Sequence, residues 1–264
     1  MSEKYDSALT YTSYLKVDEL LQLQKPLSDG PEHDELLFII IHQTYELWFK
    51  QLLHELSAAA RAMESGDSHY ALSLLGRVRT IMKVCVTQVD ILETMTPLQF
   101  NAFRDYLSSS SGFQSAQFRK VEALLGRRDS KMAGHLPEDM QAEIEEITDT
   151  NSVWDSFLIY VAGRGFNIPA DVLSRSKSIA YESNLQVQDA LLELHRKDAE
   201  AAMVSERLID IDEGIQEWRY RHVKMVERTI GAKMGSGGSS GVQYLASTLF
   251  NPVFKDLWEI RSRF

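Results

Sequence analysis

The chain has 264 residues, of which 44% are hydrophobic and 25% charged, so it is long enough for one large globular domain. Its formal net charge of -10 disfavours nucleic acid as a partner, because phosphate backbones repel an acidic protein. The N-terminus lacks a signal-peptide pattern, and no run of about 18 apolar residues is free of charges, so we expect neither secretion nor membrane insertion. The single cysteine, Cys85, excludes an intrachain disulfide, and together these features predict a cytoplasmic protein.

Long uninterrupted helices are the main prediction for the first part of the chain. Only 6 prolines and 14 glycines are present, which leaves few helix breakers. Residues 32 to about 64 contain neither and carry apolar side chains on more than one face, which predicts a long central helix of a bundle. A second long helix is predicted from about residue 69 to 95.

A short helix is predicted to follow at once. Thr96 has the character of an N-cap, and Pro97 stands at the first helical position, where its missing N–H costs nothing. The helical period then places three candidate site residues on one face, namely Phe100, Phe103 and Arg104.

The remaining chain divides into a mixed region and a second long helical region. Helical periodicity runs from 113 to 125, and residues from about 126 to 182 are expected to form smaller accessory helices and loops. From 184 to about 230 the helical pattern is nearly unbroken, with Gly214 as its only interior breaker. One face of this predicted helix carries Trp218, His222 and Val226 at intervals of four residues.

Two histidines are candidates for chemistry because they lie in apolar or aromatic helical stretches. Taken singly, His42 and His222 also fit core histidines with one satisfied hydrogen bond. Phe38 stands one turn before His42, so the pair could form a wall for a flat apolar ligand or part of the core. The acidic group of Asp210, Asp212 and Glu213 is expected to be a solvated helix face.

The sequence GSGGSSG at 235–241 is the only low-complexity tract. It lacks the lysine of a Walker motif and follows no predicted strand, which disfavours a nucleotide site. A flexible linker and a lid that orders over a substrate both fit its composition.

The chain resembles the tryptophan 2,3-dioxygenase family in four blocks that occur in the family's order and spacing: HDELLFIIIHQTYELWFKQLLHEL, FRDYLSSSSGFQSAQFR, EWRYRH and GSGGSSG. The likeness extends from about residue 9 to 261. It implies one all-α domain over residues 1–264, a bundle of long antiparallel helices that holds haem b between them. It also implies a homotetramer that acts on L-tryptophan and dioxygen.

The resemblance assigns roles to three residues of the predicted helices. His222, in EWRYRH, matches the axial ligand of the haem iron, whose imidazole must be neutral to bind metal. His42 matches the distal histidine that faces the indole N–H of the substrate. Arg104 matches the arginine that binds the substrate carboxylate, for which a planar guanidinium is well shaped.

The same resemblance implies an apolar wall and a contribution from another subunit. Phe38, Phe100 and Phe103 match the side chains around the indole ring. The N-terminal segment 1–31 matches one that reaches the neighbouring subunit's pocket, through Tyr11, Tyr14 and Leu15.

One position departs from the family pattern. Ser236 stands where the family usually has threonine, whose hydroxyl lies near the amino-acid end of the substrate. Serine keeps the hydroxyl but lacks the methyl group that stiffens the side chain and packs on the ligand. We therefore expect a difference in substrate affinity, stereochemical preference or tolerance of a modified tryptophan.

The leading interpretation is oxidative cleavage of the indole C2–C3 bond, which gives N-formyl-L-kynurenine. A monooxygenase of the same fold, which would convert tryptophan or a methylated tryptophan to a 2-oxindole, stays open and differs in product mass. A non-catalytic haem or indole sensor and a purely structural helical bundle stay open as well. The combination of His42, Arg104 and His222 disfavours the sensor, which needs no arginine directed at an amino acid.

Overall fold

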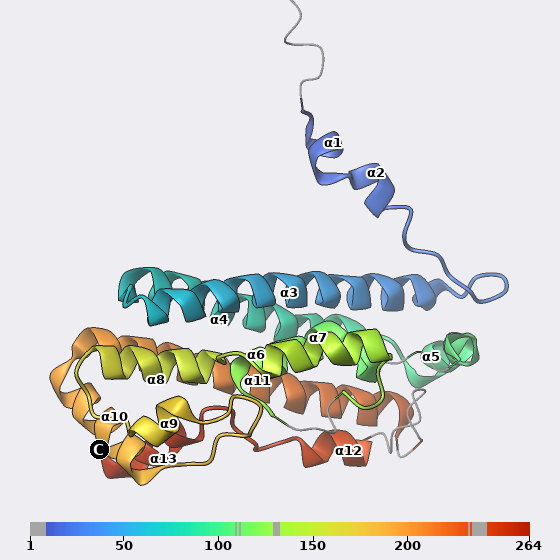
Figure 1. Ribbon diagram of the computed structural model, residues 1–264. Coiled ribbons are helices and arrows are strands. Elements are labelled where there is room, and N and C mark those ends of the chain that lie inside the picture. Colours follow the sequence, from blue (N-terminus) through green and yellow to red (C-terminus); the bar gives the residue numbers. More distant parts are fainter. Residues whose placement is uncertain (1–8, 109, 111, 129–132, 232, 234–241) are drawn as a thin grey trace, which may run out of the picture.

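The computed structural model describes residues 9–108, 110, 112–128, 133–231, 233 and 242–264 (Figure 1). Within these residues all regular structure is helical and there is no strand, which confirms the predicted all-α class. In chain order the helices are α1 (Tyr11–Leu15), α2 (Val17–Leu20), α3 (His33–Glu64), α4 (Ser68–Leu92), α5 (Pro97–Arg104), η1 (Asp105–Leu107), η2 (Gly112–Gln114), α6 (Ala116–Leu125), α7 (Glu138–Thr148), α8 (Val153–Gly163), α9 (Ala170–Ser174), α10 (Leu185–Lys197), α11 (Ala199–Ile230), α12 (Val242–Ser247), α13 (Lys255–Glu259) and η3 (Ile260–Arg263).

Three long helices, α3, α4 and α11, form the centre of the bundle (Figure 1). At a rise of about 1.5 Å per residue, a 32-residue helix such as α3 or α11 is about 48 Å long. The turn from α3 to α4 is tight: Gly66 has a φ of 78°, and the Asp67 side chain caps α4 by accepting a hydrogen bond from the Tyr70 N–H at 2.9 Å. Helix α4 packs against both α3 and α11, whereas α6 and α8 pack against α3.

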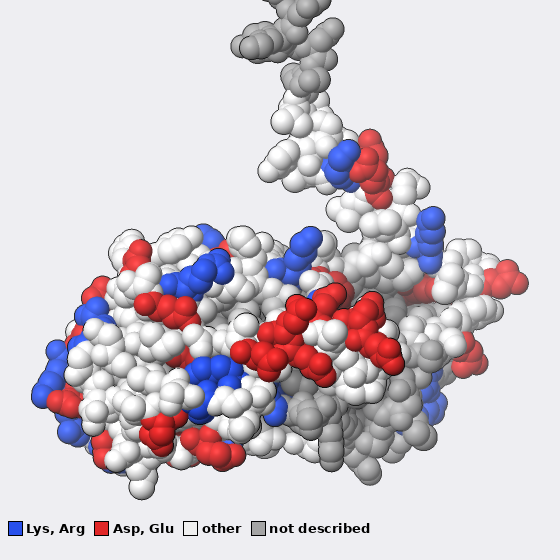
Figure 2. Space-filling model, in the orientation of Figure 1, with Lys and Arg blue, Asp and Glu red and all other residues white. Residues whose placement is uncertain are grey.

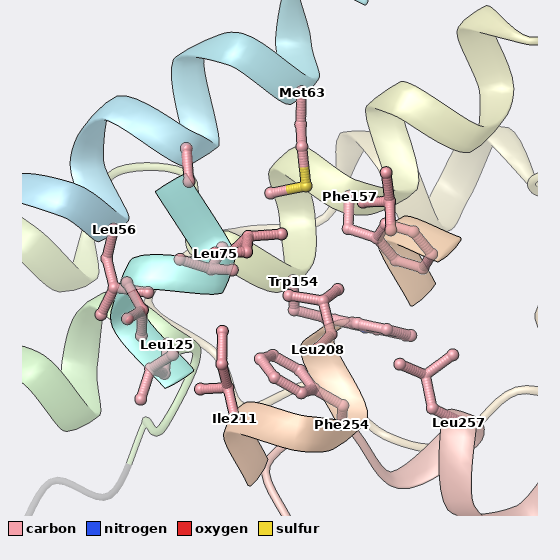
Figure 3. Packing of buried hydrophobic residues seen from close by; sticks show 14 of the residues in the cluster. Leu56, Met63, Leu75, Leu125, Trp154, Phe157, Leu208, Ile211, Phe254 and Leu257 are labelled. Atoms are coloured by element: carbon pink, nitrogen blue, oxygen red, sulfur yellow. The ribbon is translucent and has the colours of Figure 1, made fainter. Parts of the chain in front are cut away.

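The hydrophobic core joins helices α3, α4, α6, α8, α9, α10 and α11 to the C-terminal segment, and Figure 3 shows part of it. The labelled side chains converge in Figure 3 and come from segments far apart in the chain: Leu56, Met63, Leu75, Leu125, Trp154, Phe157, Leu208, Ile211, Phe254 and Leu257. Helix α8 contributes its fully buried aromatic rings to this core. Part of the 126–182 region is therefore central to the bundle.

Helix α7 better fits the expectation of an accessory helix. Only Ile144 of α7 is buried, and acidic side chains gather on the surface over this helix in Figure 2. The contrast with α8 shows that the region from 126 to 182 contains both a core helix and a peripheral one.

The long helical region after residue 184 is interrupted where the sequence pattern did not indicate it. Asp198 separates α10 from α11, and its carboxylate accepts hydrogen bonds from the Ala201 N–H at 3.0 Å and the Arg164 Nε at 2.5 Å. The expected breaker, Gly214, instead lies inside α11. A Cβ atom at Gly214 would lie 3.3 Å from the Cβ of Met82, so the glycine permits the close approach of α11 to α4.

The expected solvated face at 210–213 is wrong for Asp212. Its side chain is fully buried and accepts hydrogen bonds from the N–H groups of Val253 and Phe254 and from Nε1 of Trp258, at 2.9 to 3.1 Å. Asp212 thus fixes the C-terminal segment to α11, and its carboxylate is further satisfied by the Gln216 side chain, which donates at 3.3 Å.

Two further observations concern the sequence predictions on cysteine and membranes. Cys85 is buried, and burial raises the pKa of its thiol to about 12, which makes it an inert core residue. Across the described parts of the chain, none of the helices has the length and apolar character that a membrane span requires.

Candidate active site

A single cavity brings together five of the ten predicted site residues. It contains about 1320 Å³ of empty space, including its opening to solvent, and is bordered by α3, α5, α6, α11 and α12. Its lining includes the predicted site residues Phe38, His42, Phe100, Arg104 and His222, together with Trp218 and Val226 from the same face of α11. The remaining lining is largely apolar, so the cavity suits a large ligand with few polar groups.

His42 faces this cavity in a defined tautomer. Its Nδ1 lies 2.7 Å from the backbone oxygen of Phe38, one turn earlier on α3. A carbonyl oxygen only accepts hydrogen bonds, so Nδ1 carries the proton. Burial lowers the pKa of His42, although the Phe38 carbonyl and the charge of Glu46 act against this shift. The neutral ring therefore has an unprotonated Nε2, which is a hydrogen-bond acceptor.

His222 lies on α11 and is also neutral. Burial is the main cause that lowers its pKa to about 4, and electrostatic interactions with His42 and Arg119 contribute to the same shift. The His222 ring stacks on Trp218, with a centroid distance of 5.3 Å and an interplanar angle of 3°. None of the hydrogen bonds among the described residues involves a ring nitrogen of His222. The imidazole is thus oriented by stacking and has a nitrogen available to a ligand in the cavity.

Three phenylalanines form one connected aromatic group beside His42. The Phe38 ring lies 4.1 Å from the His42 ring, 5.9 Å from Phe100 and 5.5 Å from Phe103, measured between centroids. Phe38 and Phe100 line the cavity, whereas Phe103 is fully buried and packs behind them. Phe103 therefore supports the wall and does not border the cavity.

The last residue of α5, Arg104, also borders the cavity. The predicted N-cap places this short helix: the Thr96 hydroxyl caps the Gln99 N–H, and the Gln99 side chain accepts a hydrogen bond from the Thr96 N–H at 2.8 Å. Pro97 occupies the first helical position as expected. A stable first turn thus fixes the direction in which α5 carries Arg104.

A buried charged cluster that the sequence did not predict lies next to the cavity. Glu122 is 3% exposed and accepts hydrogen bonds from Arg119 at 2.6 Å, Arg127 at 2.8 Å and Arg219 at 2.6 Å. Arg119, Glu122 and Arg219 all line the cavity. Burial acts to raise the Glu122 pKa, but the nearby arginines lower it overall, so the carboxylate is ionised. The only local signal was the spacing of Arg119 and Glu122, since Arg219 is 97 residues away.

The predicted residues of the N-terminal segment lie elsewhere. Tyr11, Tyr14 and Leu15 belong to α1, which stands clear of the helical body in Figure 1 and does not border the cavity of its own chain. Ser236 and the rest of GSGGSSG lie outside the described residues. Within the part that is described, no three His, Cys, Asp or Glu side chains form a group suited to a metal ion.

The fold and the cavity define an all-α protein with room for a large, mostly apolar ligand between its helices, and with two neutral imidazoles and several guanidinium groups at the cavity. Residues 2–136 and 195–264 match the family model for tryptophan 2,3-dioxygenase. The chain is 54% identical over 259 residues to the tryptophan 2,3-dioxygenase of Anaeromyxobacter dehalogenans, covering 97% of both chains. It is 53% identical over 256 residues to that of Herpetosiphon aurantiacus, covering 97% of this chain and 98% of the relative. The chain belongs to the tryptophan 2,3-dioxygenase family.

Proposed function

We propose that this protein is a haem-dependent tryptophan 2,3-dioxygenase, which cleaves the indole C2–C3 bond of L-tryptophan with dioxygen and forms N-formyl-L-kynurenine. The observation that carries the proposal is the pair of neutral imidazoles, His42 and His222, at one apolar cavity in a chain of this family. The cytoplasmic location stays a prediction from sequence.

The residues present fit haem b. His222 offers a neutral nitrogen that makes no hydrogen bond within the described residues, which is the state required of an axial ligand. Arg119 and Arg219 border the same cavity, and we assign them to the haem propionates, because a guanidinium has five N–H donors and pairing with Glu122 uses only some of them. When bound in its ferrous state, the haem iron supplies the activation of dioxygen.

The protein's own contribution is to hold and orient the substrate. His42 Nε2 accepts the indole N–H, because Nδ1 already donates to the Phe38 carbonyl. Phe38 and Phe100 cover the ring, and burial of apolar surface stabilises the complex by about 25 cal/mol per Å². Arg104 binds the carboxylate. These contacts fix the reacting ring and exclude water from it.

We assign His42 to positioning and not to obligatory base catalysis, since the indole N–H is a very weak acid. His42→Ala is expected to raise the KM for L-tryptophan while appreciable turnover remains at saturation. Steady-state kinetics and substrate titration check this. Loss of all turnover with unchanged substrate affinity would contradict the assignment.

The active form is, in this proposal, a homotetramer in which the N-terminal segment of one subunit completes the pocket of the next. Helices α1 and α2 have no buried residue although they carry large apolar side chains. Tyr11 is 77% exposed, Tyr14 is 72% exposed, and Leu15 is exposed as well. Exposed apolar groups at this density mark an interaction surface. Light scattering during size-exclusion chromatography measures the oligomeric state.

Mass spectrometry of the product tests the proposed reaction. Haem-loaded, reduced protein is incubated with L-tryptophan and isotopically labelled dioxygen. Two labelled atoms in N-formyl-L-kynurenine are expected. One labelled atom in a 2-oxindole would instead identify a monooxygenase, and binding without turnover would identify a sensor.

A further inference from the structure

Residues 21–32 form the joint between the N-terminal helices and the body, and this joint is held much more firmly than helices α1 and α2 themselves. Helices α1 and α2 stand away from the body in Figures 1 and 2 and have no buried residue. The joint, in contrast, is tied to α3 by side-chain hydrogen bonds. Gln24 donates to Gln43 at 2.5 Å, and Gln43 in turn donates to the backbone oxygen of Leu23 at 3.2 Å.

Glu35 is the centre of a second and stronger tie. Glu35 is 1% exposed, and its carboxylate accepts hydrogen bonds from the N–H groups of Leu27 at 2.6 Å and Ser28 at 2.9 Å, and from the Ser28 hydroxyl. The Ser28 hydroxyl oxygen accepts a further hydrogen bond from the Glu32 N–H at 2.8 Å. Residues 27–32 are thereby folded back onto the first turn of α3.

This tie does not add a packed element to the body. Three N–H or O–H donors offset the cost of burying the Glu35 charge, and the N-terminal end of α3 favours an anion as well. The chain before the joint gains no burial in its own subunit from this arrangement. What the tie does determine is the direction in which α1 and α2 leave the body.

We propose that Glu35 is a positioning residue that directs the N-terminal segment of one subunit into the pocket of a second copy of this chain. This inference rests on the proposed shared pocket and names the group that makes sharing efficient. A segment held in its bound direction loses less conformational entropy when it docks, and its tip has a higher effective concentration at the neighbouring site. Glu35 therefore acts on the substrate affinity of a pocket to which its own side chain makes no contact.

Glu35→Gln is the direct test, and Glu32→Gln is the matched control. Both variants exchange a carboxylate for an amide three residues apart, but the Glu32 side chain is exposed and caps nothing. Glu35→Gln is expected to raise the KM for L-tryptophan about tenfold and to change kcat less than about twofold, because a buried charge-assisted contact is lost outside the reacting centre. It is also expected to shift oligomer dissociation, followed by light scattering on dilution, to higher protein concentration. Glu32→Gln is expected to match the wild type in both measurements.

Mixed oligomers distinguish a role across the interface from a role within one subunit. Each variant is co-expressed with Arg104→Ala under a second affinity tag, and oligomers that carry both tags are purified. In the Glu35→Gln mixture, the intact pocket of the Glu35→Gln subunit receives an intact N-terminal segment from the Arg104→Ala subunit. Sites with the wild-type KM should therefore reappear. The parallel mixture of Tyr14→Ala with Arg104→Ala tests whether pockets are shared at all.

The outcomes separate the two ideas. Recovery in both mixtures supports the proposal. Recovery with Tyr14→Ala but not with Glu35→Gln would overturn the role of Glu35 and leave the shared pocket standing. Absence of recovery in both mixtures would overturn the shared pocket, and the role of Glu35 with it. Equal KM values for Glu35→Gln and Glu32→Gln would also overturn the role of Glu35.

Discussion

The buried charged cluster at the cavity and the N-terminal segment are held in place differently: the cluster is buried within its own chain, whereas the segment is exposed. Around Glu122, three arginines converge on one carboxylate inside the folded body, so this part of the site is complete in a single chain. Helices α1 and α2 have no buried residue, and their attachment to the body depends on a joint centred on Glu35. Under the proposed function, cofactor binding would belong to the single subunit, whereas enclosure of the substrate would require a second one.

The largest effect is expected from His222→Ala, which tests the claim that one chain is sufficient for haem. Loss of groups that only orient a metal ligand already costs about 10- to 100-fold, so loss of the ligand itself should lower turnover more than about 100-fold. The Soret absorbance of the purified variant should fall with it, while the helical circular dichroism stays. A variant that retains full haem and activity would show that another group binds the iron.

Glu122→Gln probes the same region through stability. Removing the negative charge leaves arginines facing one another in a buried site, which should lower the free energy of unfolding by about 3 to 5 kcal/mol. Since the arginines lower the Glu122 pKa in the folded state, the contribution is present above the ordinary carboxylate pKa and is lost as pH falls through the lowered value. Urea unfolding between neutral and acidic pH measures both. Wild-type stability at neutral pH would show that the cluster does not hold the site together.

Tyr14→Ala should affect the other region and leave the first unchanged. Because Tyr14 is 72% exposed in its own subunit, the free energy of unfolding of a dissociated subunit should change by no more than about 0.5 kcal/mol. The KM for L-tryptophan should rise about tenfold or more, because a large aromatic contact is lost from the neighbouring pocket. An unchanged KM in the intact oligomer would remove the distinction between the two regions.

The smallest effect is expected from Ser236→Thr, which restores the residue usual in the family. One added methyl group in contact with the ligand contributes about 0.8 kcal/mol, so the KM for L-tryptophan should fall about fourfold. Comparing L-tryptophan, D-tryptophan and a ring-methylated tryptophan shows which preference the serine changes. Identical kinetics for all three substrates in both proteins would mean that position 236 does not contact the substrate.

The features that the sequence predicted correctly depend on neighbours in the chain. The long helix α3 followed from an uninterrupted apolar pattern, and the start of α5 followed from Thr96 and Pro97. His42 and His222 were found because each lies in an apolar helical stretch, and the family resemblance ranked them above other histidines. Both line the cavity, although their assigned roles remain predictions.

The features that the sequence did not predict depend on partners far along the chain. Asp212 was predicted to lie on a solvated acidic face because the C-terminal groups that bury it begin 41 residues later, and nothing local indicated that Glu122 pairs with Arg219. The break at Asp198 was not predicted because aspartate is also common on exposed helix surfaces. Its hydrogen bond with Arg164, which is distant in the sequence, becomes visible only in the fold. The sequence shows which residues carry a charge, but whether a charged side chain is buried depends on the whole fold.

The absence of a side chain at Gly214 affects the candidate active site as well as the packing of α11. Gly214 lies two turns before His222, and on a straight helix that separation is about 12 Å. Because a Cβ atom there would press on Met82, the absence of a side chain sets how closely α11 approaches α4. A side chain at this position would require Met82 or α11 to shift by a few tenths of an ångström, and His222 lies on the same helix. The position of the His222 imidazole in the cavity thus depends partly on an atom that Gly214 does not have.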